Sequence, residues 1–171
     1  MILPLTAPLE IPATESTSLR LYADPRPHVG KITGLQKGLV WVAQGRELIE
    51  EGYGFGCPIV EIEGRSYNSR HAETEVISTG NETRLVKRYR IDTADTPIRF
   101  LRRKYRPVPS QGVVSVTYDM HLPGIIDVEV DFTQLKGAWQ RVYLMNEQGA
   151  GVFRYYRDER GTRHERETLG N

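Results

Sequence analysis

The stretch VVSVTYDMHLPGIIDVEVDF, residues 113 to 132, decides the fold class. Apolar and polar residues alternate along both of its halves, and a period of two is typical of a half-buried β-strand. Leu122, Pro123 and Gly124 separate the halves, and a three-residue loop with a left-handed glycine closes a hairpin. We therefore predict two antiparallel strands with facing apolar rows. The rows are Val114, Val116, Tyr118 and Met120 on one strand and Ile126, Val128, Val130 and Phe132 on the other.

Similar alternation recurs along most of the chain. Further strands are expected over 18–22, 38–43, 58–63, 72–78, 83–91, 98–105, 139–144 and 152–157. Gly80 and Asn81 predict a tight hairpin turn, because both residues accept a positive φ. Helix-forming residues concentrate at 46–51, which could equally be an edge strand. We predict an all-β fold, an antiparallel two-sheet β-sandwich of ten to twelve strands with at most one short helix. A closed lipocalin-like barrel is the alternative.

Length and proline content predict a simple domain organisation. The 171 residues match one globular domain. Residues 1–16 contain three prolines and are expected to form an extended arm on the surface. Residues 17–157 are expected to form the β-sandwich domain. Residues 158–171 are a polar tail or a last edge strand around 162–166.

Composition excludes several classes of protein. The 23 Lys and Arg residues balance 22 Asp and Glu, so the net charge of +1 identifies no polyanionic partner. No apolar run reaches eighteen residues, which argues against a membrane span. The single cysteine, Cys57, rules out an intramolecular disulfide and a thiolate metal site, and with it we expect a cytoplasmic protein. The four histidines lack metal-ligand spacing, so no metal and no cofactor are expected.

A glycine-rich segment, GYGFGCP at residues 52–58, precedes an expected strand. A phosphate-binding loop would need a following helix and a lysine, and neither is present. The segment therefore indicates a bulged or bent strand entry, although Tyr53 and Phe55 could offer aromatic faces to a ligand. Cys57 lies between apolar residues without a neighbouring base, which favours a buried, inert thiol.

Opposite charges gather on two neighbouring segments. On the outward face of the 113–132 hairpin, Asp119 is expected opposite Asp127, with Glu129 and Asp131 nearby. Opposed carboxylates require a cation close by. Residues 84–106 contain nine Lys and Arg against two Asp, an excess of +7. If the strands form a meander, strand 98–105 pairs with the strand that carries Asp119, and a charge ladder explains both clusters. The alternatives are a phosphate-tracking surface in the basic segment, and calcium binding or two catalytic carboxylates on the acidic face.

Two resemblances to known families bear on function. Leu135, Gly137 and Trp139 resemble the Gly-x-Trp signature of lipocalin-like barrels, but here it lies late in the chain, so Trp139 is expected to be a core anchor at a strand start. Segments 50–60, 64–67 and 142–147, under a third of the chain, resemble β-supersandwich domains of the galactose-mutarotase type. That resemblance implies a sugar-related role. The family's His pair and catalytic Glu have no counterpart here, so no catalytic residue is carried over.

The sequence therefore predicts a non-catalytic binding or accessory module with carbohydrate as the favoured ligand class. Aromatic rings and polar groups on a sheet face would bind the sugar. The expected ligand-binding residues are Tyr67, Arg70, His71, His121 and Tyr143. One alternative is a carbohydrate-active enzyme, epimerase-like or glycosidase-like, with Asp119 and Glu129 as acid and base. A less favoured alternative is a single-stranded nucleic-acid binder that uses residues 84–106. Exposed edge strands could also pair into a homodimer.

Overall fold

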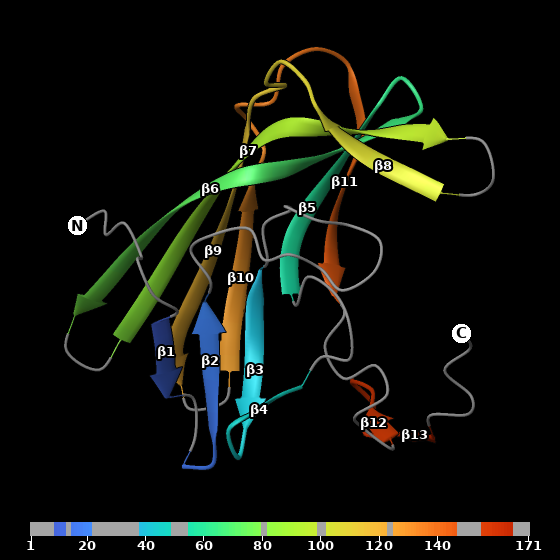
Figure 1. The fold of residues 1–171 in the computed structure, drawn as a ribbon. Helices are drawn as coiled ribbons and strands as arrows, with labels where there is room; N and C mark the ends of the chain where they lie inside the picture. Colours follow the sequence, from blue (N-terminus) through green and yellow to red (C-terminus); the bar gives the residue numbers. More distant parts are fainter. Residues whose placement is uncertain are drawn as a thin grey trace.

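The computed structural model describes residues 9–12, 15–21, 38–48, 55–79, 82–98, 102–122, 125–146 and 155–165. Within these ranges every regular secondary-structure element is a β-strand (Figure 1). The strands are β1 (Leu9–Pro12), β2 (Thr17–Leu21), β3 (Leu39–Ala43), β4 (Arg46–Glu47), β5 (Phe55–Ile62), β6 (Arg65–Thr79), β7 (Glu82–Ile98), β8 (Arg102–Pro107), β9 (Val113–Leu122), β10 (Ile125–Asp131), β11 (Trp139–Asn146), β12 (Tyr155–Arg157) and β13 (Arg163–Glu165). The described part of the chain contains no helix that is long and apolar enough to cross a membrane.

Eleven of these strands form one antiparallel sheet. Its order is β1-β2-β3-β5-β6-β7-β9-β10, while β4, β8 and β11 pair beside β3, β7 and β5 respectively. Among the described pairings β1 and β10 are the two ends of the order, so the sheet does not close. The fold is therefore not the lipocalin-like barrel that the sequence left as an alternative. β12 and β13 form a separate two-stranded sheet.

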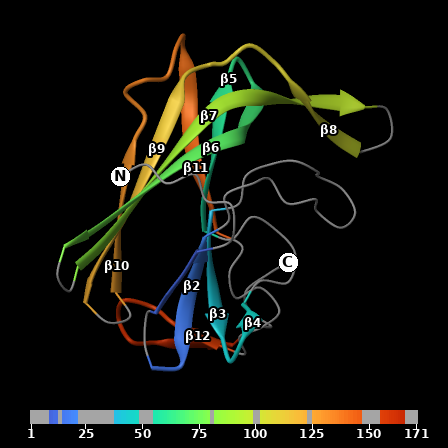
Figure 2. The same ribbon diagram turned by 60° about the vertical axis from the view of Figure 1, so that its left-hand side comes forward.

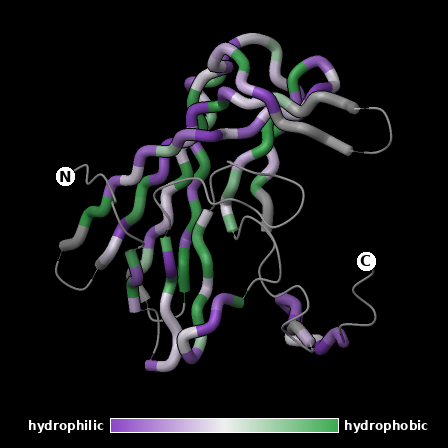
Figure 3. The backbone as a smooth tube through the Cα atoms, viewed as in Figure 1, coloured by the Kyte–Doolittle hydropathy of each residue, from purple (hydrophilic) through white to green (hydrophobic). Residues whose placement is uncertain are grey.

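The large sheet folds over itself into two layers. Strands β1 to β3 lie in front of β9 and β10 in Figure 1, and the two groups remain apart in the turned view of Figure 2. Leu19 and Leu39 belong to the same buried cluster as Leu85 and Val116, although β2 and β3 are not hydrogen-bonded to β7 or β9. Figure 3 shows hydrophobic and hydrophilic residues alternating along these strands. The predicted all-β sandwich is confirmed.

The 113–132 hairpin has the predicted facing rows and a shorter turn. Leu122 pairs with Ile125, so the loop has two residues, not three. The inward side chains of β9 at Val114, Val116 and Tyr118 are 0% exposed. Phe132 departs from the prediction: Asp131 accepts hydrogen bonds from the Thr133 amide and hydroxyl, which turns the chain away after β10.

Trp139 begins a strand as predicted but is not a core anchor. Its ring lies edge-on to that of Phe132, with 5.0 Å between centroids, and the two residues are 38% and 37% exposed. Both residues lie at the connection between β10 and β11, where the alternation of the preceding strand has already ended. The two aromatic rings thus cover each other outside the buried cluster.

Strands β6 and β7 are longer than the sequence predicts. Thr79 pairs with Glu82, which confirms the hairpin with a two-residue turn at 80–81; those two residues lie outside the described ranges. The expected strand 72–78 is the second half of β6, because register shifts between Asn68, Ser69 and His71 break the alternation earlier in the strand. β7 likewise continues to Ile98, the first residue of the expected strand 98–105.

The segments of uncertain type are also strands where they are described. Arg46 and Glu47 pair with β3, which agrees with the edge-strand interpretation at these two positions; residues 49–51 of the expected segment lie outside the described ranges. Leu9–Pro12, within the expected N-terminal arm, pairs with β2, and Leu9 and Ile11 pack against the core. Arg163–Glu165 is a polar strand paired with β12.

Candidate functional site

The outer face of β7, β9 and β10 carries a charge ladder. Arg84 is paired directly with Asp119 in the register, and its guanidinium lies 2.5 Å from the carboxylate. Asp119 in turn is opposite Asp127, as predicted. The cation expected beside these carboxylates is present, but its predicted source is wrong. β9 pairs with β7 along 83–90 and β8 pairs with β7 along 93–98, so β8 follows β9 along one edge of β7 and does not pair with it.

The other described cations of β7 are engaged within the protein. Arg88 lies 2.9 Å from Glu75, and Arg90 lies 3.1 Å from Asp92. Lys87 has no exposed surface and faces the core. The side chains of residues 95–105 lie outside the described set, so the basic segment is described only in its first half. In that half, phosphate binding would compete with existing ion pairs.

The two candidate catalytic carboxylates share a face. Asp119 is opposite Asp127 and Glu129 is opposite Thr117, so Asp119 and Glu129 occupy diagonal positions. Diagonal neighbours in antiparallel pairs are about 7 Å apart. The Asp119 carboxylate forms an ion pair with Arg84, whereas Glu129 is exposed. The described residues contain no group of three or more His, Cys, Asp or Glu side chains placed to hold a metal ion.

The five predicted ligand-binding residues do not form one surface. Tyr67 packs against the core beneath the Arg65 guanidinium, 5.6 Å from its ring. Arg70 is half-buried, and its amide donates to Asp92 at 3.1 Å. His71 is exposed on β6, with Nε2 3.8 Å from the same carboxylate. His121 belongs to β9, but its side chain lies outside the described set.

Tyr143 belongs to a different part of the sheet, on β11. It is 43% exposed and pairs opposite Ile59 of β5. Its hydroxyl donates to Glu61 Oε2 at 3.2 Å and accepts from Arg141 Nη1 at 3.3 Å. The hydrogen bond from Arg141 raises the pKa of its guanidinium. We call Glu61, Arg141 and Tyr143 the Tyr143 surface. Sequence reasoning missed Glu61 and Arg141, which the alternation along β11 and the pairing with β5 bring beside Tyr143.

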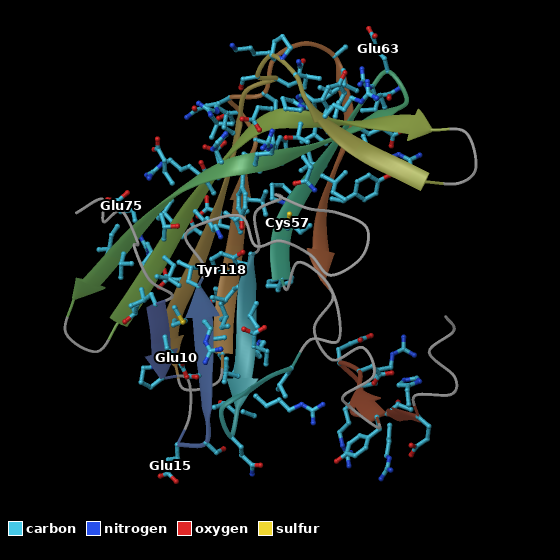
Figure 4. All side chains as sticks on the ribbon, in the orientation of Figure 1. Glu10, Glu15, Cys57, Glu63, Glu75 and Tyr118 are labelled. Atoms are coloured by element: carbon cyan, nitrogen blue, oxygen red, sulfur yellow. The ribbon has the colours of Figure 1, made fainter. Side chains whose placement is uncertain are left out.

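A polar cluster that sequence reasoning did not anticipate lies inside the fold. Its members are 0% exposed and are Cys57, Asn68, Lys87, Tyr89 and Tyr118. Figure 4 shows the labelled Cys57 and Tyr118 in the interior, from β5 and β9. The predicted burial of Cys57 is confirmed, and its Sγ donates to Asn68 Oδ1 at 3.4 Å. The sequence contained one signal for this cluster: Lys87 occupies an inward position of the alternation between Leu85 and Tyr89.

Burial determines the ionisation of this interior cluster. Desolvation lowers the pKa of Lys87 to about 7, because the charged ammonium loses water. Desolvation also raises the pKa values of Tyr89 and Tyr118, so both phenols stay neutral. Tyr118 donates to the Phe55 carbonyl at 2.9 Å. At neutral pH the cluster therefore combines two neutral phenols with an amine whose pKa lies near 7.

Gly56 makes this arrangement sterically feasible and confirms the predicted bulge at the strand entry. Met145 pairs with Cys57 and Asn146 pairs with Phe55, so Gly56 is the extra residue, with φ of +92°. A Cβ at this position would lie 1.8 Å from the Tyr118 hydroxyl.

Comparison with known proteins yields no relative: no family model, no curated protein and no solved structure matches this chain. The resemblance to galactose-mutarotase-type domains therefore stays a prediction.

Proposed function

We propose that this protein is a carbohydrate-binding module and that the Tyr143 surface contacts the sugar. The observation that carries the proposal is an exposed aromatic ring whose hydroxyl is held between Arg141 and Glu61. Such a ring offers an apolar face to a pyranose, and the two flanking groups supply donors and an acceptor for its hydroxyl groups. Because two hydrogen bonds already hold the hydroxyl, the Tyr143 side chain loses little further conformational freedom when a sugar binds.

A sheet edge suits this role because a chain-like ligand can lie along it. β11 pairs with β5, and the Tyr143 surface faces outward from this pair. The single, buried cysteine supports a cytoplasmic location for the module.

The test is a calorimetric titration of the full chain with glucose, galactose and their α- and β-linked tetrasaccharides. We expect one class of tetrasaccharide to bind, and Tyr143→Ala to weaken that binding about tenfold, because the ring supplies the apolar contact. Tyr155→Ala is the matched control, since Tyr155 is also an exposed tyrosine, on β12. Absence of binding by every sugar, or equal weakening in both variants, would contradict the proposal.

A further inference from the structure

β10 is an end strand of the large sheet. In the described residues it pairs with β9 alone, and Figure 2 shows it at the outer margin of its layer. The free side of an edge strand presents a row of backbone N–H and C=O groups that can pair with a further strand. A strand that pairs here must match the side chains on both faces of β10.

The inward row of β10 is incompletely covered. Ile126, Val128 and Val130 are half-buried, whereas Val114 and Val116 of the neighbouring β9 are 0% exposed. Ile125 at the start of β10 is 51% exposed. One more strand with aliphatic inward residues would remove this apolar surface from water, at about 25 cal/mol for each Å² buried.

The outward row of β10 is acidic. Asp127, Glu129 and Asp131 are all exposed. Among the residues that the structure describes, none forms an ion pair with Glu129, and the side-chain partner of Asp131 is the neutral Thr133. Asp119, one strand further in, is matched by Arg84. Glu129 and Asp131 thus have no basic partner among the described residues, in contrast to Asp119 on β9, which has Arg84 on β7.

Charge also argues against a second β10 strand as the occupant. Two β10 edges in antiparallel pairing would bring the carboxylates of both copies onto the same outward face. Like charges on directly opposed positions of paired strands are destabilising. A complementary occupant carries cations at the outward positions and aliphatic residues at the inward ones.

We propose that the free edge of β10 docks an extended segment of a partner protein in which Lys or Arg alternates with Val or Ile. The segment adds a strand to the sheet by backbone hydrogen bonds. Its aliphatic residues cover Ile126, Val128 and Val130, and its cations lie beside Glu129 and Asp131.

The test uses the full chain and a fluorescein-labelled peptide, TKVRVKVRT, followed by fluorescence anisotropy at low and moderate salt. We expect saturable binding that weakens with salt, and no binding of the acidic control peptide TEVEVEVET. Hydrogen exchange should report added protection in β10 and none in β6. Failure to bind the basic peptide at about 1 mM, or equal binding of both peptides, would overturn the proposal.

Charge-reversal variants separate a docked strand from general attraction to acidic surface. Glu129→Lys should weaken binding of the basic peptide about tenfold. Glu73→Lys, at an equally exposed glutamate on the outer face of β6, should leave binding unchanged. Equal loss in both variants would overturn the proposal. A dimer of the peptide-free protein in light scattering that Glu129→Lys abolishes would also overturn it, because a second copy of the chain would then occupy the edge. Sugar binding at the Tyr143 surface is measured separately and does not depend on these results.

Discussion

Lys87 is a fully buried lysine whose position follows from strand alternation. It lies on β7 directly opposite Thr74 of β6, with its Nζ 5.3 Å from the centre of the Tyr89 ring. Burial disfavours the ammonium, whereas the Cys57 thiolate would favour it, and the desolvation dominates. The folded protein therefore holds a lysine that loses its proton near neutral pH.

Lys87→Met should increase stability at pH 6 by a few kcal/mol, since one pKa unit corresponds to about 1.4 kcal/mol. The pKa of Lys87 is about 7 in the folded protein and near 10.5 when the chain is unfolded. Below pH 7 both states bind the proton, and the cost of burial is fully present. Between pH 7 and pH 10.5 the unfolded chain binds more protons than the folded protein, so wild-type stability rises with pH. The advantage of the variant should shrink from pH 7 to 9.5 in urea unfolding.

Lys136→Met provides the comparison, because Lys136 is an exposed lysine. It should leave both the stability and its pH dependence close to those of the wild type. A constant difference between Lys87→Met and wild type across pH 6 to 9.5 would show that Lys87 is not desolvated.

Gly56→Ala should destabilise the protein by at least about 2 kcal/mol, since it combines a strained φ with a clash. Gly64→Ala, at a φ of +71° with nothing within 4 Å of the added Cβ, should cost about 1 kcal/mol from backbone strain alone. Adding Tyr118→Phe to Gly56→Ala removes the nearest clashing atom, so the double variant should lose less than the sum of its parts. Additive losses in chemical denaturation would rule out this contact.

At the level of strands, the β7–β9 pairing depends on charge as well as on apolar rows. The Arg84 and Asp119 side chains are 55% and 25% exposed, so their ion pair should contribute only about 0.5 kcal/mol. Arg84→Gln should therefore destabilise modestly, and less so in an Asp119→Asn background, where the unmatched carboxylate is gone. A double-mutant cycle at low and high salt measures this coupling, and zero coupling at low salt would refute the ladder.

Hairpins were the most predictable elements of this chain. The 113–132 alternation and the Gly80–Asn81 turn define local pairings, and both were recovered, including Asp127 opposite Asp119. The predicted partner of strand 98–105 was wrong, because β9 and β8 pair with successive parts of the same edge of β7 and not with each other. Nothing in the local pattern of either strand indicates this arrangement.

In the whole molecule, the two sheets should differ in stability. β12 and β13 have three residues each and pair with each other, outside the large sheet. Amides of residues 155–165 should therefore exchange with solvent well before those of β7 and β9. Removing residues 155–171 should shift Tm by less than about 4 °C. Slow exchange in β12, or a much larger drop in Tm, would show that this hairpin is integral to the sandwich.

Long-range pairing organises the candidate binding surface. Tyr143 meets Glu61 across 82 positions of sequence, through the antiparallel pairing of β11 with β5. The sequence placed seven residues on one sheet face. The six whose side chains are described are instead divided among β6, β9, β10, the core and β11. Alternation specifies which way a side chain points relative to its own strand, but not which strands become neighbours.

By itself, the sequence determined the all-β class, most of the strands, two hairpins and the burial of Cys57, because these features depend on residues close together in the chain. Only the tertiary structure decided that one open sheet supplies both layers, that β10 is an end strand, and which residues surround Tyr143 and Lys87. Each of these depends on contacts between segments far apart in sequence. The free energy of such contacts comes from apolar surface buried between distant segments, and the local alternation of residues does not specify which segments meet.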